Sequence, residues 1–383
     1  MKIVHTADWH LGKIVSGQSL TEDQAYQLQQ LVELLKDEAA DVLMIAGDLY
    51  DRAIPPLEAV ELLNETLATI NLELKIPIVA ISGNHDSSNR LNFGSSWYQK
   101  NDFYLTTQIS QIFKPVTIGD VQFWLIPFFE NLEAAAYFED STIRTQEAAM
   151  RRIIEQIEPL MDRSKRQIAM AHLFVTGAEP SESERPLAMG GVDAVSAKLF
   201  KAFDYTALGH LHRPHALGKI TTDTLPQGTV SYSGSLLKYS FSEVKDQKSV
   251  RIITIPQKGE LQMREVPLHP QRDMRLVKAE MAALLAEPTA FGPVDDYLQI
   301  TLTDVGDVYE PMRRLKEVFP HLLHLERAAQ TAIHQQGQQF KDLKQADILT
   351  LFSQFFETVE QQPLTDVDRE FMQNVIDESR RGE

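Results

Sequence analysis

The chain has 383 residues, of which 43% are hydrophobic and 24% are charged, and it carries a net charge of −17 and no cysteine. This length predicts two or three domains with a large core, and the lack of cysteine excludes disulfides, thiolate metal sites and cysteine nucleophiles. The acidity is shared, with 23 basic and 32 acidic residues up to residue 256 and 14 and 22 beyond it, which argues against a chain that holds DNA by itself.

The first predicted element is a strand over IVHTAD, which ends at Asp8 and is followed by His10. Four to six apolar residues bounded by turn residues are typical of a buried strand. Met1 and Lys2 lead directly into this strand, and no stretch of the chain reaches the ~18 uncharged apolar residues of a membrane span. We therefore expect no signal peptide, no membrane segment and a cytoplasmic protein.

The next elements are two helices separated by a strand. Apolar residues at helical spacing predict a helix over 20–40 with Thr21 as its cap, and a second helix over 55–70 that opens with prolines. Between them, VLMIAGD predicts a strand that ends at Asp48.

Strands and helices continue to alternate after residue 70. IVAISGNH predicts a strand that carries Asn84 and His85 at its end. A strand near 121–126 and a helix over 145–163 then lead to IAMAH, a strand that ends at His172. This alternation favours a layered α/β fold.

The segment 176–192 is rich in Gly, Pro and Ser and is long for a connector. Long loops beside a site are often functional, although mobility alone also explains this composition. TALGHLH then predicts a strand that carries His210 and His212. Strands near 229–236 and 250–255 follow without helices between them, so the sheet is mixed or there are two sheets.

The chain changes in character beyond PQKG at 256–259, which predicts a turn before a last strand of the first domain. We expect a first domain over 1–268, a small α+β capping domain over 269–334, and a linker with a helical tail over 335–383. The capping domain is predicted as a helix (275–286), a strand (297–303), a helix (309–318) and a strand (322–327).

The tail begins with the polar linker QQGQQ at 335–339 and continues with two predicted amphipathic helices. The second helix opens with Thr365 and Asp368 at a capping-box-like spacing. Either both helices fold back onto their own domain, or they dock on a partner, because two short helices cannot bury so many apolar side chains between themselves. Those side chains are Ile348, Leu351, Phe352, Phe355, Phe356 and Val359, then Phe371, Val375 and Ile376.

Five predicted strands end in residues of the metal-ligand type. Sites in layered α/β proteins gather beyond the carboxyl ends of strands, so we expect one metal cluster of Asp8, His10, Asp48, Asn84, His172, His210 and His212. A lone histidine after a strand is usually structural, but ligand-type residues at the ends of five separate strands are improbable by chance. His5 lies inside its strand, so we expect it to be packed or to lie behind the site. We expect ordinary structural roles for five further histidines that do not follow a predicted strand of this kind: His215, His269, His321, His324 and His334.

The mixture of carboxylate, amide and imidazole ligands suits Mn²⁺, Fe²⁺ or Zn²⁺ better than Ca²⁺. Seven side chains are too many for one ion, and they fit two ions bridged by Asp48, which stands alone after its strand. Two such ions activate a water and stabilise a phosphoryl group. With no Walker-A loop and no GxSxG elbow, hydrolysis by metal-bound hydroxide is expected. His85 cannot easily face the same ion as Asn84, so it is a candidate general acid or phosphate contact.

The set DxH, GD, GNHD, a lone His and GHLH resembles the calcineurin-like metallophosphoesterases, and the flanking sequence is similar to their bacterial DNA-nuclease branch up to about residue 250. The resemblance implies a four-layer αββα sandwich with a small α+β capping domain and a C-terminal helical tail. It also implies two Mn²⁺ ions, with Mg²⁺ or Fe²⁺ possible in their place. By position, one ion would be held by Asp8, His10, Asp48 and His212, and the other by Asp48, Asn84, His172 and His210.

The resemblance further implies an ATP-dependent double-strand exonuclease and single-strand or hairpin endonuclease that acts in DNA repair, recombination and replication. The tail would bind a coiled-coil ATPase subunit in a heterotetramer of two copies of each chain, associated with the nucleoid. The ATPase would then supply many of the phosphate contacts that this acidic chain lacks. Arg90, just past GNHD, is a candidate DNA contact, and a solvated surface role is equally open.

Two rival interpretations remain. The first is a generic phosphatase or nucleotide phosphodiesterase on the same core, which would need neither a capping domain nor a tail. The second is a non-catalytic scaffold, which would be expected to lose metal ligands, whereas every expected ligand is present here.

Overall fold

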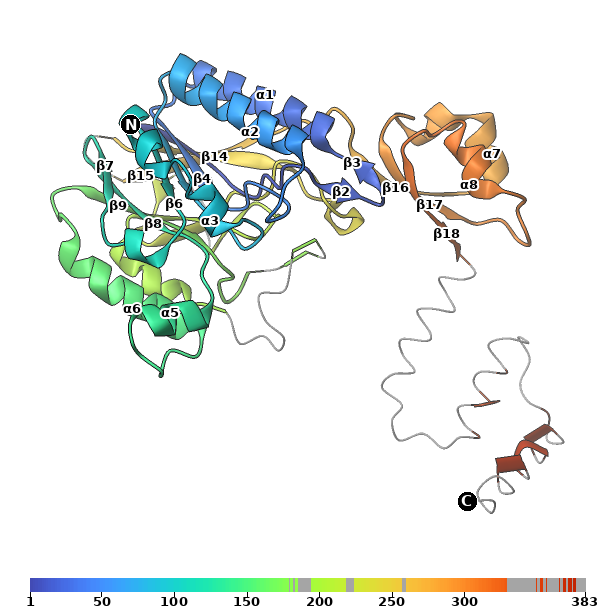
Figure 1. Ribbon diagram of the computed structural model, residues 1–383. Coiled ribbons are helices and arrows are strands. Elements are labelled where there is room, and N and C mark those ends of the chain that lie inside the picture. Colours follow the sequence, from blue (N-terminus) through green and yellow to red (C-terminus); the bar gives the residue numbers. More distant parts are fainter. Residues whose placement is uncertain are drawn as a thin grey trace. The chain divides into compact units, whose positions relative to one another are not determined.

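The computed structural model describes residues 1–178, 180, 181, 183, 184, 194–217, 224–256 and 260–328, and residues 349, 352, 353, 356, 365, 368, 369, 371–373, 375 and 376 (Figure 1). The chain divides into two compact units, Met1–Arg275 and Leu276–Glu383. The predicted linker at 335–339 lies outside the described residues, as do most of the loop 176–192, most of the turn at 256–259 and most of both predicted tail helices. Among the described residues, no helix is both long and apolar enough to cross a membrane.

The first unit contains two mixed sheets, and the larger has seven strands in the order β12-β15-β14-β1-β4-β5-β6. Its four parallel strands are rich in apolar residues and almost wholly buried, as expected for strands that are covered on both faces. These are β1 (Lys2–Thr6), β4 (Val42–Ala46), β5 (Ile78–Ile81) and β6 (Phe103–Thr106). The antiparallel side is β14 (Ser249–Thr254), β15 (Leu261–Pro267) and β12 (Thr224–Leu225).

The second sheet has six strands in the order β11-β13-β10-β9-β8-β7. Its parallel strands are β8 (Val121–Ile126), β9 (Arg166–His172), β10 (Tyr205–Gly209) and β13 (Thr229–Tyr232). Antiparallel strands β7 (Val116–Ile118) and β11 (His215–Leu217) lie at its two edges. A small hairpin, β2 (Ile14–Val15) and β3 (Gln18–Ser19), stands apart from both sheets.

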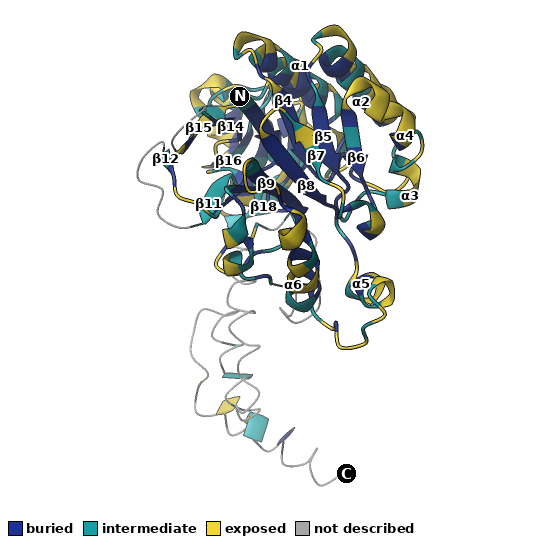
Figure 2. Ribbon diagram, turned by 90° about the vertical axis from the view of Figure 1, so that its left-hand side faces the viewer, coloured by how far each residue is buried: buried dark blue, intermediate teal, exposed yellow. Residues whose placement is uncertain are grey.

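The two sheets pack face to face, and helices cover both outer faces. Residues of both sheets, such as Met44 and Phe123, share one apolar cluster. On the outside of the first sheet lie α1 (Thr21–Asp37) and α2 (Leu57–Ala68), while α5 (Asn131–Tyr137) and α6 (Gln146–Ile157) cover the second. Figure 2 shows the buried strands between helices whose outer faces are exposed. The predicted four-layer αββα sandwich is confirmed.

Short helical segments connect these layers. A π-helix, η1 (Thr69–Glu73), extends α2, and 3-10 segments occur at η2 (Gln99–Asn101), η3 (Ile109–Gln111), η4 (Glu158–Leu160), η5 (Ala197–Ala202) and η6 (Phe241–Glu243). Two single-turn helices, α3 (Ser88–Leu91) and α4 (Ser95–Tyr98), follow the loop that carries Asn84 and His85.

The second unit contains most of a three-stranded sheet in the order β16-β17-β18, and the boundary between the units falls within β16. The strands are β16 (Met274–Ala279), β17 (Tyr297–Leu302) and β18 (Leu322–Arg327). The remaining elements are α7 (Met281–Ala286), η7 (Pro288–Phe291) and α8 (Pro311–Lys316). Leu284, Leu298, Leu315 and Phe319 form the centre of its own apolar core.

Two local predictions are wrong. Thr21 does not cap its helix, because it is the first helical residue and Leu20 occupies the cap position without a side-chain hydrogen bond. The helix predicted over 275–286 is a strand in its first half, because β16 pairs beside β17 and buries Met274 and Val277. Their spacing of three residues imitates a helical repeat, so pairing within the sheet overrides the local pattern.

Candidate metal centre

Five strands from two sheets deliver the predicted ligands to one place. The carboxyl ends of β1, β4 and β5 in the first sheet meet those of β9 and β10 in the second. Six of the seven predicted ligands are buried, with at most 5% of their surface exposed, and Asn84 is half-buried. The structure therefore brings together all seven side chains that the strand-end pattern selected.

Asp48 lies between the two halves of this cluster. Its Oδ2 is 3.5 Å from His10 Nε2 and 3.3 Å from His172 Nε2. Its Oδ1 accepts a hydrogen bond of 2.8 Å from the backbone N–H of His85. One carboxylate thus faces histidines from both sheets, which is the position required of a residue shared by two ions.

The first half of the cluster contains Asp8, His10 and His212, which offer ligand atoms within 4.8 Å of one another. The Nε2 atoms of His10 and His212 are 3.1 Å apart. Imidazole nitrogens and a carboxylate that converge in this way form a donor set for a divalent transition-metal ion.

The second half contains Asn84, His172 and His210. Asn84 Oδ1 lies 2.9 Å from His172 Nε2 and 3.3 Å from His210 Nδ1. His172 Nδ1 is 2.8 Å from the carbonyl of Ala46, so Nδ1 donates to that carbonyl and Nε2 faces the cluster. The backbone N–H of His210 donates to both oxygens of Asp8, at 3.0 and 3.1 Å, which ties the two halves together.

Glycines allow the ligand loops to approach this closely. A Cβ on Gly83 would lie 2.2 Å from Asp48 Oδ1, and a Cβ on Gly47 would lie 2.4 Å from His172 Nδ1. Gly47 also has a φ of +92°, which disfavours any other residue. The small residues before Asp48 and Asn84 are therefore part of the site and not ordinary turn residues.

Replacing Gly209 should disturb the cluster without changing any ligand. In Gly209→Ala the new Cβ would lie 1.9 Å from the carbonyl oxygen of Ala46, so the β9–β10 end must move away from β4. We expect weaker Mn²⁺ binding and a loss of roughly 1–3 kcal/mol of stability, measured by metal titration and thermal melting. Gly17→Ala is the control for Mn²⁺ binding, because its φ of +82° also strains the substitution but open space surrounds its Cβ, and we expect its Mn²⁺ binding to stay unchanged. Undiminished Mn²⁺ binding by Gly209→Ala would show that the two strand ends adjust independently.

The two buried carboxyl groups of the cluster, Asp8 and Asp48, have pKa values shifted in opposite directions. Burial raises the pKa of Asp8 to about 7, against the opposing effect of His172. Burial also opposes ionisation of Asp48, but His172 and His10 hold the pKa of that carboxyl well below its usual range. Burial would lower the pKa of His172, yet Asp48 raises it to about 9. Without metal, a proton on His172 compensates the charge of Asp48, and a cation can take over that role.

Two acidic residues that the sequence reasoning missed support the ligand loops. The carboxylate of Asp86 accepts hydrogen bonds from the backbone N–H groups of Leu49 (3.1 Å), Tyr50 (3.0 Å) and Gly83 (2.9 Å), and so joins the loop after β4 to the loop after β5. Asp51 lies 2.7 Å from Lys13 Nζ and 3.6 Å from His10 Nδ1. The motifs GNHD and GDLYD mark Asp86 and Asp51 as residues near the site, but they do not identify the partners of these carboxylates.

His85 lies at the edge of the cluster. Its Nδ1 is 2.8 Å from the carbonyl oxygen of Asp51, and its ring stands edge-on to His10 with centroids 4.5 Å apart. Together with His10 and Asp51 it forms a further group whose ligand atoms lie within 4.8 Å. The bond to the Asp51 carbonyl and the contact with His10 fix the orientation of this ring.

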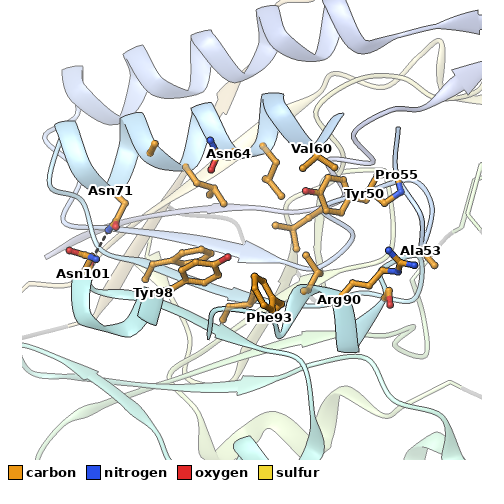
Figure 3. A pocket seen from close by; sticks show the side chains of 18 of the residues that line it. Tyr50, Ala53, Pro55, Val60, Asn64, Asn71, Arg90, Phe93, Tyr98 and Asn101 are labelled. Carbon is orange, nitrogen blue, oxygen red and sulfur yellow. Dashed lines mark hydrogen bonds between the residues drawn. The ribbon is translucent and has the colours of Figure 1, made fainter. Parts of the chain in front are cut away.

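The other singled-out residues lie apart from the cluster. His5 is fully buried inside β1, with Nδ1 3.0 Å from the hydroxyl of Tyr205, as expected for a packed residue. His215 stacks on Tyr232. Arg90 lies in α3 and lines a separate apolar pocket (Figure 3).

The chain is similar to proteins of known kind over almost its whole length. Residues 1–214 match the family model described as calcineurin-like phosphoesterase, and residues 270–360 match one described as type 5 capsule protein repressor C-terminal domain. The SbcD chain of the nuclease SbcCD from Staphylococcus epidermidis is 38% identical over 376 residues, which cover 98% of each chain.

Solved structures with low identity also align. A dimetal phosphatase from Danio rerio is 11% identical, with a TM-score of 0.40, and covers 70% of this chain and 98% of its own. The protein TT1561 of Thermus thermophilus is 14% identical, with a TM-score of 0.39, and covers 65% of this chain and 92% of its own.

Proposed function

The chain belongs to the calcineurin-like phosphoesterase family, and on that premise we propose that it is a manganese-dependent DNA nuclease subunit. The observation that carries the proposal is Asp48, whose single oxygen Oδ2 faces His10 and His172 from the two halves of a buried cluster. The full-length likeness to a nuclease subunit supports DNA as the substrate. Rapid cleavage of p-nitrophenyl phosphate esters with no cleavage of DNA would favour the generic phosphatase instead.

The donor set fits two divalent ions. We assign Asp8, His10, Asp48 and His212 to one ion and Asp48, Asn84, His172 and His210 to the other, with Mg²⁺ or Fe²⁺ as substitutes for Mn²⁺. When bound, such ions polarise a phosphoryl oxygen and lower the pKa of a water. The chain itself contributes the burial of the ligands, the fixed Nδ1 proton of His172 and the clamp that Asp86 forms between the two ligand loops.

His85 is the proposed proton donor to the leaving oxygen or contact to the scissile phosphate. The carbonyl oxygen of Asp51 fixes its ring by accepting from Nδ1, and Nε2 is the nitrogen that we propose acts on the substrate. General acids must lie within hydrogen-bond reach of the atom that they protonate, and His85 lies directly beside His10. Arg90, in the helix that follows GNHD, is the proposed contact to the DNA backbone.

The activity is tested with the chain and its partner together. We propose that an SbcC-type ATPase completes the enzyme as an ATP-dependent double-strand exonuclease and single-strand or hairpin endonuclease in DNA repair, recombination and replication, in the cytoplasm at the nucleoid. End-blocked duplex DNA should be degraded with Mn²⁺, the ATPase and ATP, and degradation should cease when ATP is left out. Degradation of the duplex that proceeds equally without the ATPase and ATP would contradict this division of labour.

An apolar surface on the first unit supports the proposed heterotetramer of two nuclease and two ATPase chains. A pocket of about 490 Å³ opens between α2 and the α3–α4 segment (Figure 3). Around this segment lie large apolar side chains that are strongly exposed, including Ile54 (69%), Phe93 (75%) and Trp97 (70%). Exposed apolar surface of this kind is typical of a protein interface, and a second copy of the chain is its proposed occupant.

The tail is the proposed contact to the ATPase. Truncation after Gln339 removes both predicted amphipathic helices and leaves the whole described cluster. We expect Mn²⁺ binding and single-strand cleavage to remain, while co-purification with the ATPase and ATP-dependent duplex degradation are lost. Pull-down and duplex assays with the full-length chain as control measure this. Undiminished complex formation by the truncated chain would exclude the tail as the contact, and insolubility would indicate that the helices fold back onto their own unit.

A further inference from the structure

The segment that follows β9 contacts the face of His212 that is turned away from His10. Ser183 Oγ lies 2.6 Å from His212 Nδ1, and Glu184 Oε1 accepts a hydrogen bond of 2.8 Å from the backbone N–H of His212. Ser181 N–H in turn donates to Glu184 Oε2 at 2.5 Å. Both the ring and the backbone of one proposed ligand are therefore held by a short loop segment.

A buried charge pair stands behind Ser183. The hydroxyl of Ser183 donates to Glu243 Oε1 at 2.5 Å. The other oxygen of that carboxylate, Oε2, pairs with Lys248 Nζ at 2.5 Å. Lys248 Nζ also donates to the carbonyl oxygen of His212 at 2.8 Å. Glu243 is fully buried and Lys248 nearly so, and a buried charge is retained only when it is paired and hydrogen-bonded.

These contacts select one tautomer of His212. Because the hydroxyl of Ser183 gives its proton to Glu243, it is an acceptor toward His212, whose Nδ1 must carry the proton. The lone pair of Nε2 then faces the cluster, where His10 Nε2 lies 3.1 Å away. The Nδ1 atom of His172 is held differently, by the carbonyl of Ala46 in β4.

We propose that Ser183, with Glu243 behind it, is a positioning residue that sets the affinity of one of the two ion positions. The inference rests on the proposed function, because it takes His212 as a ligand. The two ion positions then differ in what orients their histidines. The carbonyl of Ala46 in a core strand orients His172, and the hydroxyl of Ser183 in a loop orients His212. Residues that orient a metal-binding histidine from behind typically change metal affinity ~10–100-fold when they are removed.

The test is a Mn²⁺ titration of the metal-free full-length chain by calorimetry. Ser183→Ala should weaken one of the two binding steps ~10–100-fold and leave the other within about threefold. Ser183→Thr keeps the hydroxyl and should restore the wild-type titration. Ser164→Ala is the matched control, because Ser164 also donates to a carboxylate, Asp162 Oδ1 at 2.6 Å, but on the exposed surface.

The tautomer gives a second readout that needs no metal. In the metal-free chain labelled with ¹⁵N-histidine, His212 should be protonated at Nδ1 in the wild type and in Ser183→Thr, and should lose that preference in Ser183→Ala. If both Mn²⁺-binding steps of Ser183→Ala are unchanged, or both are weakened equally, the inference is overturned and the proposed function is not affected. A wild-type chain that binds no Mn²⁺ would overturn the proposed function, and the inference with it.

Discussion

Asp48→Ala should reduce the Mn²⁺ content of the purified chain from two ions to almost none and abolish cleavage of DNA. Asp48 Oδ2 faces His10 and His172, so its removal takes an anionic ligand from both coordination spheres at once. Two-metal hydrolysis needs both ions, and a chain with neither has no route to an activated water. Metal analysis and nuclease assays measure the two effects separately.

Asp37→Ala, which removes an exposed carboxylate at the end of α1, is the matched control and should keep both ions and full activity. Asp48→Asn preserves the acceptor for the His85 backbone N–H but not the charge, so it should fold like the wild type and still lose metal. Full retention of one ion in Asp48→Ala would show that this carboxylate serves a single ion.

His85→Ala should lower the cleavage rate ~10²–10⁴-fold, the usual contribution of general acid–base catalysis, with nearly unchanged metal content. The substitution removes the ring that Asp51 orients but leaves the backbone N–H that donates to Asp48. Single-turnover cleavage rates, measured beside Mn²⁺ content, separate catalysis from binding. His269→Ala, at an exposed position, is the control and should cleave at the wild-type rate.

Two outcomes would contradict the role assigned to His85. A wild-type cleavage rate in His85→Ala would remove it from catalysis altogether. Stoichiometric loss of one ion would make it a ligand, in line with the group that it forms with His10 and Asp51, and the division of the cluster would then need revision.

The sequence selected side chains that lie close together in the structure, because strand ends are local signals. A run of apolar residues, a glycine and then Asp48 or Asn84 can be read without knowing the fold, and the layered arrangement brings such ends together. The same local logic failed at 275–286, where Met274 and Val277 imitate a helical repeat but are buried in a strand. Pairing with a distant strand decides that segment, and no local pattern reports it.

The residues behind the ligands were not predicted, because their partners are distant in sequence. The GNHD motif marks Asp86, but its partners include the backbone N–H groups of Leu49 and Tyr50, and backbone groups carry no sequence signal that identifies them. Glu243 lies 60 residues after Ser183, which it contacts. Such contacts depend on how the loops fold over the sheets, and only the structure reveals them.

The order of the strands also governs when the metal centre can exist during synthesis. β1, with Asp8 and His10 just beyond it, precedes the other strands of its sheet along the chain. It nevertheless lies between β4 and β14, and β14 begins only at Ser249. His212, whose Nε2 lies 3.1 Å from that of His10, follows His10 by 202 residues. Contacts of such long separation form late in folding. A nascent or prematurely terminated chain that stops before His210 therefore lacks two of the seven predicted ligands and cannot assemble the complete cluster.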